Sequence, residues 1–302
     1  MSERLGAVCV RALAHAAGED QSIWLLDGDL ADSYGATAFE DQFPDRFVMG
    51  GIAEQNLVSM AAGLAACDQR PWVFSFAAFL IGRAYDQVRV SLSQANTHVV
   101  LVGSHAGGCG GRNGKTHLAL NDLAMVCSLP NFEVWSPADP SDVIYATQRL
   151  CSEQNGGPVY MRLPRQPCGT LPGEAGEFRA FGDGAGILIV GYGLSAHWAL
   201  EVREILNANC VAATVISVAK LSPLPRELSE KLQLAEKLYI IEDHVKHGGL
   251  HTILTNCQSI KINGWFGWPC NWAGESGTEG ELRAACGLDA QSIAAAILVE
   301  LQ

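Results

Sequence analysis

The sequence predicts an α/β protein of two doubly wound domains, each with a mainly parallel sheet. Short runs of β-branched and aromatic residues alternate with longer stretches of helical periodicity, which is typical of parallel strands joined by crossover helices. A segment rich in proline and glycine interrupts this alternation near the middle of the chain, and the alternation then resumes. We therefore expect a first domain over residues 1–167, a linker over residues 168–184 and a second domain over residues 185–302.

The first domain is predicted to contain six strands and one especially regular helix. The helix spans Gln55–Ala66 and places Leu57, Met60 and Leu64 on one face. Its second half is almost entirely alanine and glycine, so it can pack closely against a neighbour, and we expect it in a buried or interface position. The predicted strands are Ser22–Leu26, Arg46–Met49, Trp72–Phe76, His98–Gly103, Phe132–Ser136 and Pro158–Arg162.

The second domain repeats the pattern after the linker. Its predicted helices lie near Ser195–Ala208 and Gly249–Gln258. Its predicted strands are Ile187–Val190, Ala212–Val218 and Lys237–Ile241.

The composition narrows the possible functions. The formal net charge is −12 and no basic run occurs, which disfavours nucleic acid and anionic membranes as partners. No apolar run reaches the roughly 20 residues of a membrane span, and the first residues lack a signal-peptide layout. The ten cysteines are scattered singly, without the C-x-x-C spacing of zinc or redox sites. We expect a cytoplasmic protein with reduced thiols and no metal site of its own.

Polar groups gather at four places where this fold would put a site, just beyond the ends of strands. In Gly51–Asn56, Glu54 stands at the entry to the small-sided helix. Taken alone, the simpler interpretation is that Glu54 caps the helix or favours its dipole. The aromatic residues of Phe74–Phe79, followed by Arg83–Arg89, are in most proteins part of a core.

The other two places favour function more directly. Ser104–His117 contains five glycines, which let a backbone approach a ligand closely, and a histidine lies near each end. Arg162–Gln166 ends a strand with two guanidinium groups, Arg162 and Arg165, that suit a phosphate or a carboxylate.

Taken in order, these stretches resemble a known family. GIAEQN, FSFAAF with RAYDQVR, SHAGG with NGKTH, SLPNFEVWSPADPSD and GPVYMRLPR follow one another as in the pyrimidine-binding domain of transketolases. IEDHVKHGGL, residues 241–250, is similar to the acidic-His-x-x-x-Gly-Gly segment of the family's C-terminal domain. The resemblance covers nearly the whole chain and indicates the C-terminal half of a transketolase, as one subunit of an enzyme split over two polypeptides.

The resemblance implies thiamine diphosphate as cofactor and transfer of a two-carbon ketol unit from a ketose (phosphate) to an aldose. Glu54 falls on the family's activating glutamate, which bonds the pyrimidine ring so that the cofactor's own amino group can deprotonate its thiazolium carbon. Phe76 and Phe79 would pack on the aminopyrimidine, with Gly82 in the same cofactor-binding stretch.

Further site residues follow from the same resemblance. With Glu54, His105 and His117 form the implied catalytic set, the two histidines facing the sugar substrate. Arg4 fits a phosphate-binding position only approximately. The implied substrate-binding residues are Ser33, His105, Arg112, Asn113, His117 and Arg165.

One departure from the family affects specificity. Transketolases usually read Gly-Glu-Asp-Gly-Pro-Thr-His in the glycine loop, whereas Asn113 replaces the aspartate here and Arg112 and Lys115 add positive charge. An amide both donates and accepts, and a carboxylate only accepts. We expect a substrate with extra negative charge or altered hydroxyl stereochemistry.

A second departure concerns the diphosphate. Full-length transketolases hold it and Mg²⁺ through a Gly-Asp-Gly motif followed by Asn in an N-terminal domain. Gly182-Asp183-Gly184 instead enters a predicted strand, with no suitably placed Asn. The resemblance therefore implies an N-terminal-half (α) subunit that holds most of the Mg²⁺ and diphosphate, in an α2β2 complex with the small-sided helix at the interface.

Several other functions remain open. A 1-deoxyxylulose-5-phosphate synthase shares the AEQ and RAYDQV patterns, and a 2-oxoacid dehydrogenase E1 β subunit is also a separate chain. The three enzymes differ in their acceptors: a sugar aldehyde, glyceraldehyde phosphate with pyruvate, or a lipoyl domain. A degenerate regulatory or scaffold half is the non-enzyme alternative, and a hydrolase built on Cys109 is a remote one.

Overall fold

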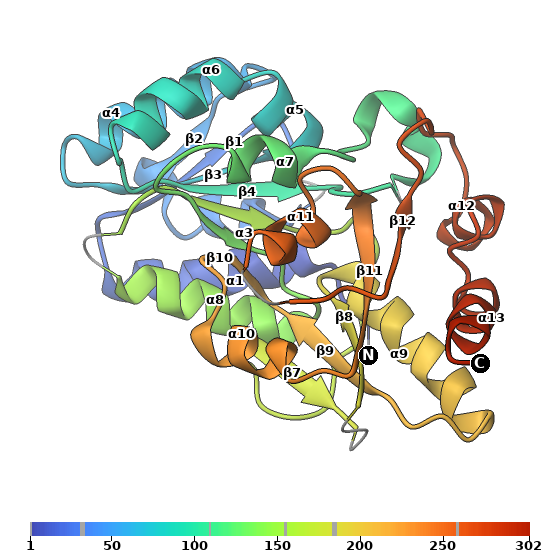
Figure 1. Cartoon of the computed structure of the whole chain (residues 1–302). Coiled ribbons are helices and arrows are strands. Elements are labelled where there is room, and N and C mark those ends of the chain that lie inside the picture. Colours follow the sequence, from blue (N-terminus) through green and yellow to red (C-terminus); the bar gives the residue numbers. More distant parts are fainter. Residues whose placement is uncertain (1, 31–33, 109, 154–155, 183–185, 258–259) are drawn as a thin grey trace.

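Two parallel-rich sheets, of seven and five strands, organise the chain (Figure 1). The computed structural model describes residues 2–30, 34–108, 110–153, 156–182, 186–257 and 260–302. Helices cover both faces of each sheet, so the predicted α/β class with mainly parallel sheets is confirmed.

The first sheet has the order β10-β5-β6-β4-β3-β1-β2, and all strands except β10 run parallel. All six strands predicted for the first domain are present, with ends that differ by one or two residues. Their bounds are β1 (Ile23–Asp27), β2 (Phe47–Met49), β3 (Arg70–Phe76), β4 (Val100–Ser104), β5 (Glu133–Trp135) and β6 (Val159–Arg162).

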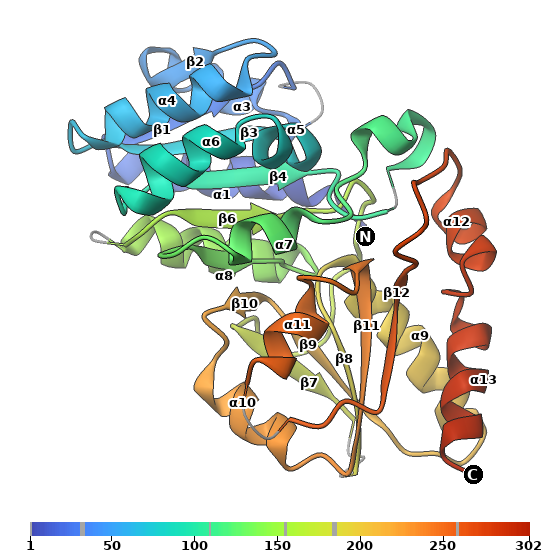
Figure 2. The same cartoon turned by 45° about the horizontal axis from the view of Figure 1, so that its top comes forward.

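Helices on both faces explain why β4 and β6 are buried along their whole length. On one side lie α1 (Leu5–Glu19) and α8 (Pro140–Ser152), and α8 begins at a proline behind the capping side chain of Asp139 (Figure 2). The other side carries α4 (Glu54–Ala65), the helix predicted over Gln55–Ala66. Further α-helices among the described residues of this domain are α3 (Thr37–Glu40), α5 (Ala77–Gly82), α6 (Tyr85–Gln87) and α7 (Asp122–Cys127).

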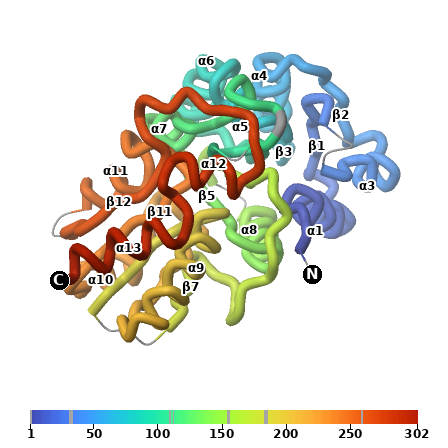
Figure 3. The backbone as a smooth tube through the Cα atoms, turned by 90° about the vertical axis from the view of Figure 1, so that its right-hand side faces the viewer, coloured from blue at the N-terminus to red at the C-terminus, as the bar shows by residue number. Residues whose placement is uncertain are grey.

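The second sheet has the order β12-β11-β8-β9-β7, with only β7 antiparallel. Its three predicted strands are present as β8, β9 and β11. The bounds are β7 (Phe178–Phe181), β8 (Ile187–Gly191), β9 (Thr214–Val218), β11 (Lys237–Val245) and β12 (Gly264–Trp268). One face is covered by α9 (Leu194–Ala208) and α13 (Ala290–Glu300), the other by α10 (Arg226–Gln233) and α11 (Leu250–Thr255) (Figure 3).

Two strands do not follow the predicted division into domain, linker and domain. The range 168–184, predicted as a linker, contains β7, which pairs with β9. Its short Phe-Arg-Ala-Phe pattern is hidden in the sequence by the glycines around it. The strand β10 (Lys220–Ser222) belongs to the second half of the chain, yet it pairs antiparallel with β5 of the first sheet.

The stretch 279–300 is apolar enough, with a mean hydropathy of 1.4, to pass a length-and-composition test for a membrane span. In the structure it is divided into α12 (Glu279–Ala285) and α13. Thr278 forms a capping box at the start of α12, and Asp289 caps α13. Ala290, Ile293, Ala294 and Ile297 on one side of α13 are buried in the same core as α9, and 39% of the apolar window as a whole is buried.

Candidate active site

Glu54 is the first residue of α4, at the carboxyl ends of the parallel strands, and only 1% of it is exposed. Its Oε2 forms a 2.6 Å ion pair with Nη1 of Arg83, and its Oε1 accepts a 3.3 Å hydrogen bond from the Ser75 hydroxyl. The helix has no side-chain cap bond. The capping interpretation is therefore wrong, because the carboxylate points to β3 and α5 rather than to its own helix.

Four predicted site residues form one ring cluster beside this carboxylate. Phe76 ends β3, and its ring lies edge-on to His105 at 4.4 Å and to His117 at 5.6 Å between centroids. Phe79, in α5, contacts His117 at 5.1 Å and carries the Arg83 guanidinium over its face at 4.6 Å. Arg83 thus connects the buried acid to the aromatic cluster.

His105 lies directly after β4 and has an unusual backbone conformation. Its φ is +55°, and its Nδ1 lies 2.8 Å from the hydroxyl of Ser104, which accepts a hydrogen bond from the buried Tyr34 hydroxyl. Burial, with the positive charges of Arg165 and Arg4, lowers the pKa of His105 to about 4. The ring is neutral at neutral pH. Because Tyr34 donates to Ser104, the Ser104 hydroxyl keeps its own proton to donate to Nδ1, and the His105 tautomer that accepts it carries its proton on Nε2.

A cavity of about 200 Å³ lies on the other side of His105. Arg4 and Arg165 give it two positive charges, and a backbone pairing of Glu3 with Cys168 brings the two arginines to the same place. The cavity is lined by Arg4, Gly6, Tyr34, Ser104, His105, Pro164 and Arg165. Two guanidinium groups beside a neutral imidazole suit a phosphate or another terminal anion.

Arg162, predicted with Arg165 to bind an anion, has a different position. It is 3% exposed and forms a 2.8 Å ion pair with Asp122, and it also donates a 2.6 Å bond to the backbone carbonyl of Asp243. The interpretation of Arg162 as an anion-binding group is therefore wrong. Its charge is already neutralised inside the protein, and only Arg165 reaches the cavity.

The glycine-rich loop packs closely against side chains of the second domain. A Cβ added at Gly107 would stand 1.8 Å from Oδ2 of Asp243, and one at Gly108 would stand 2.2 Å from the Trp268 ring. At these positions the close approach is to the second domain, rather than to a ligand as the composition predicted. Asn113 and Lys115 are exposed at the loop's tip, beyond these glycines.

For several predicted residues the structure gives no contact that bears on their role. Gly82 is exposed at the end of α5, with open space around it. Ser33 and Cys109 lie outside the described residues, as do Asp183 and Gly184, and for Arg112 only the backbone is described. Within the described ranges no group of three or more His, Cys, Asp or Glu is placed to hold a metal ion, and every cysteine of these ranges is free.

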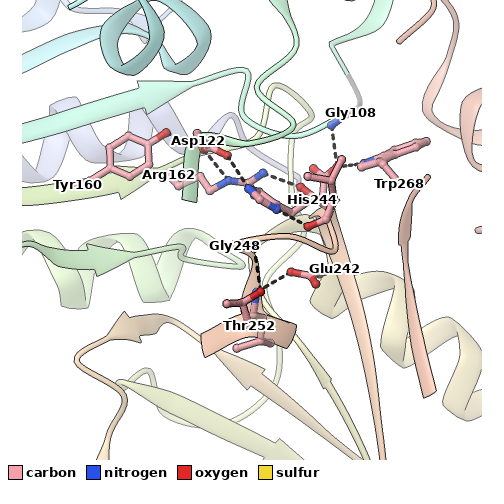
Figure 4. Close-up of polar contacts among 12 residues, drawn as sticks. Gly108, Asp122, Tyr160, Arg162, Glu242, His244, Gly248, Thr252 and Trp268 are labelled. Carbon is pink, nitrogen blue, oxygen red and sulfur yellow. Dashed lines mark hydrogen bonds and ion pairs between the residues drawn. The ribbon is translucent and has the colours of Figure 1, made fainter. Parts of the chain in front are cut away.

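A buried polar network between the two domains was missed by sequence reasoning. Asp122 accepts from Arg162 and from the Tyr160 hydroxyl at 2.7 Å, and its other oxygen lies 3.8 Å from Nε2 of His244 (Figure 4). Asp243 joins the network through Arg162. Asp243 and His244 stand in the IEDHVKHGGL segment, but nothing in a linear pattern shows which distant groups they meet.

Comparisons with known proteins agree with this arrangement. Residues 4–169 match the transketolase pyrimidine-binding domain, and residues 176–293 match the transketolase C-terminal domain. The chain belongs to the transketolase family and corresponds to its C-terminal half. It is 31% identical to a transketolase C-terminal section from Methanocaldococcus jannaschii, with 93% of this chain and 91% of that protein covered.

Other similar proteins include both separate subunits and longer single-chain enzymes. The chain is 32% identical to a 6-deoxy-6-sulfo-D-fructose transketolase subunit from Clostridium sp. (strain MSTE9), covering 72% of this chain and 69% of that subunit. It is 35% identical to a 1-deoxy-D-xylulose-5-phosphate synthase of Geobacter metallireducens, but spans only 47% of that protein. A split-gene transketolase, described as an inactive β4 tetramer, superimposes with a TM-score of 0.84 at 30% identity over 100% of this chain and 99% of that one.

Proposed function

We propose that this chain is the β-type subunit of a thiamine-diphosphate-dependent transketolase that moves a two-carbon ketol unit from a ketose to an aldose. The observation that carries the proposal is Glu54, a buried carboxylate held beside a cluster of two phenylalanine and two histidine rings. The split-gene relatives, which this chain matches along nearly their whole length, support a separate subunit.

The described residues fit the pyrimidine end of the cofactor. Among the described residues, Oε1 of Glu54 bonds only the Ser75 hydroxyl, at 3.3 Å. Phe79, paired with Phe76, offers an apolar face beside Arg83, the ion-pair partner of Glu54. Bound thiamine diphosphate supplies a nucleophilic carbon for the ketose carbonyl. In this proposal Glu54 holds a proton at the pyrimidine ring, while its surroundings exclude water.

The substrate end is proposed to be the arginine-lined cavity. Arg4 and Arg165 would bind a terminal phosphate or sulfonate, while neutral His105 donates through Nε2–H to a sugar oxygen. Asn113 and Lys115 lie exposed near His117, and the changed loop sequence fits a substrate that differs from ordinary pentose phosphates.

The proposed partner is an N-terminal-half subunit in an α2β2 complex, which would hold the diphosphate and Mg²⁺. Three large apolar side chains, Met49, Ile52 and Met60, are 48%, 69% and 36% exposed around the start of α4. Apolar groups grouped beside a site are typical of an interface. A related split-gene chain, assembled as a β4 tetramer, is described as inactive, which supports a requirement for the N-terminal-half partner. Cytoplasmic location remains part of the proposal.

Calorimetric titration of thiamine diphosphate with Mg²⁺ tests the split site. We expect binding by the chain co-purified with its N-terminal-half partner and none by the chain alone. Tight binding by the lone chain would contradict the partner-held diphosphate site.

The synthase and dehydrogenase alternatives are separated by the acceptor. A sugar aldehyde as acceptor for a ketose donor supports the proposal. Product formation only from glyceraldehyde phosphate with pyruvate, or only with a lipoyl domain, would replace it. A complex whose activity does not depend on this chain would indicate a scaffold.

A further inference from the structure

The loop that carries His117 is closed at its base within the first domain. Gly107 and Ala119 exchange two backbone hydrogen bonds, of 3.0 and 3.2 Å, which bring the two ends of the loop together. Asn113 and His117 lie on this loop, 107–119. Figure 2 shows the segment leaving the end of β4 and extending to the side of β12 and α12, away from the helices of its own domain.

The outside of the loop rests on the second domain at several points. Val245 donates a 3.1 Å backbone bond to Leu120, directly after the loop. At the tip, Gly277 N–H lies 3.4 Å from the Gly111 carbonyl. A Cβ at Gly114 would stand 2.6 Å from the Ser276 hydroxyl. The loop is therefore formed against a surface that the first domain does not supply.

Asp243, in β11, makes a side-chain hydrogen bond to this loop from the second domain. It is fully buried, and its Oδ1 accepts a 2.8 Å bond from the Gly108 N–H and a 2.6 Å bond from the Trp268 indole (Figure 4). Bonds to a carboxylate are stronger than those between neutral groups, and a buried bond exchanges poorly with water. The missing side chains at Gly107 and Gly108 leave the space that this carboxylate fills.

The charge of Asp243 has a compensating partner. Arg162 donates to the backbone carbonyl of Asp243 and pairs with Asp122, so a guanidinium lies beside the buried carboxyl. Burial raises the pKa of Asp243, and the positive charge of Arg162 opposes that rise. The two buried residues thus come from different domains and meet behind the loop.

We propose that Asp243 is a positioning residue for the sugar substrate: it anchors the loop 107–119 from the second domain, and so fixes His117 at the Phe76–Phe79 cluster. The role in substrate binding rests on the proposed function, whereas the anchoring itself does not. Asp243 touches neither substrate nor cofactor; it acts through the loop. The second domain thereby takes part in specificity, although all the proposed catalytic side chains lie in the first.

Hydrogen exchange of backbone amides in the full chain tests the anchoring without any turnover. In Asp243→Ala the Gly108 amide loses its charged acceptor and the loop loses this anchor, so we expect exchange across residues 106–120 to rise roughly tenfold or more. In Asp243→Asn, which keeps an acceptor oxygen but no charge, we expect a rise of about threefold. If the alanine variant does not fold, the same exchange measurement is made on the asparagine variant.

Glu242→Gln is the matched control. Glu242 precedes Asp243 on β11 and is equally buried, but its oxygens accept from Leu250 and from Tyr192, away from the loop. We expect this variant to speed exchange in α11 and leave the loop unchanged. Equal loosening of the loop in the Asp243 and Glu242 variants, or no loosening in either Asp243 variant, would overturn the anchoring.

In the assembled enzyme the expected signature is a rise in KM for the sugar that exceeds the loss of kcat, because the loop contacts substrate and not cofactor. Thiamine diphosphate affinity should stay within about threefold of wild type, since Glu54 and its neighbours are untouched. Loosened exchange with an unchanged KM would remove the role in substrate binding while leaving the proposed transketolase activity standing.

Discussion

The candidate site and the contact between the two domains are built from the same kinds of side chain, but they offer a ligand very different conditions. The site contains Glu54, and Glu242 precedes Asp243 of the domain contact on β11; both are buried glutamates near the start of a helix. Glu54 has one hydroxyl donor and an ion pair to Arg83, whose side chain is 42% exposed. Glu242 accepts from Trp265, Tyr192 and two amides of α11, so both of its oxygens already have partners within the protein. The first acid can exchange its partners for a ligand, and the second cannot.

The same contrast holds for the basic residues. Arg162 ends β6 and Arg165 follows three positions later, yet Arg165 faces a cavity and Arg162 is enclosed by Asp122 and the Asp243 carbonyl. Burial lowers the pKa of both His105 and His244 to about 4. His105 lines the arginine-lined cavity, whereas His244 is 0% exposed. A perturbed pKa therefore does not by itself distinguish a functional group from a structural one; access of its partners to solvent does.

The largest expected effect comes from Glu54→Gln. The amide cannot hold a proton at the pyrimidine ring as a carboxylate does, so turnover of the assembled enzyme should fall by about a hundredfold to ten-thousandfold. Glu242→Gln, the counterpart inside the second domain, should retain turnover within about threefold. Steady-state kinetics on both variants checks this, and equal losses would erase the distinction between the two acids.

Arg165→Met tests the cavity. Loss of hydrogen bonds to a charged group should raise KM for a phosphorylated or sulfonated sugar by about tenfold to a hundredfold. The KM for the same sugar without its terminal anion should stay nearly constant. A uniform loss for charged and uncharged sugars would place the anion elsewhere.

The pH dependence of stability should depend on Glu242. Burial raises the pKa of this carboxyl to about 7, so the folded state binds its proton more tightly than the unfolded state. Its contribution to stability is fully present below a pH of about 4.5 and is lost as the pH rises through 7. Denaturant unfolding at several pH values should therefore show wild type losing stability relative to Glu242→Gln between about pH 5 and 7.5. Parallel curves would contradict the raised pKa.

The smallest effect is expected from Tyr34→Phe. Without its donor, the Ser104 hydroxyl is no longer forced to donate to Nδ1 of His105, and the imidazole can present either tautomer to the substrate. A neutral hydrogen bond of this kind corresponds to about a twofold to tenfold loss in kcat/KM. Kinetics with Ser104→Ala should reproduce it, because the same relay is broken one step later.

Local patterns predicted much of this molecule. The strands after Glu54's helix, the two histidines of the glycine loop and the aromatic pair were all visible as short motifs, and the structure brings Phe76, Phe79, His105 and His117 together. The residues that were missed depend on long-range contacts. Gly108 and Asp243 are 135 positions apart, and no periodicity could show that the glycines make room for a carboxylate.

Two edge strands, β7 and β10, were not predicted for a related reason. With three or four residues each, β7 and β10 are too short to show an alternation, and each is defined only by the strand it joins. Arg83 begins the RAYDQVR motif but had no predicted role, because the sequence gives no sign that its guanidinium turns back to Glu54.

The placement of β10 has a consequence for how this protein can be divided. A segment beyond the linker completes the sheet before it, with Lys220 paired opposite Trp135. A fragment cut at residue 167 would keep the six parallel strands and lose the strand that covers the edge of β5. Exposed edges of this kind favour aggregation. The two domains have separate sheets, but the first is complete only with β10 from the second half of the chain. Chimeras that exchange the first domain between relatives should therefore include residues 219–222 with it.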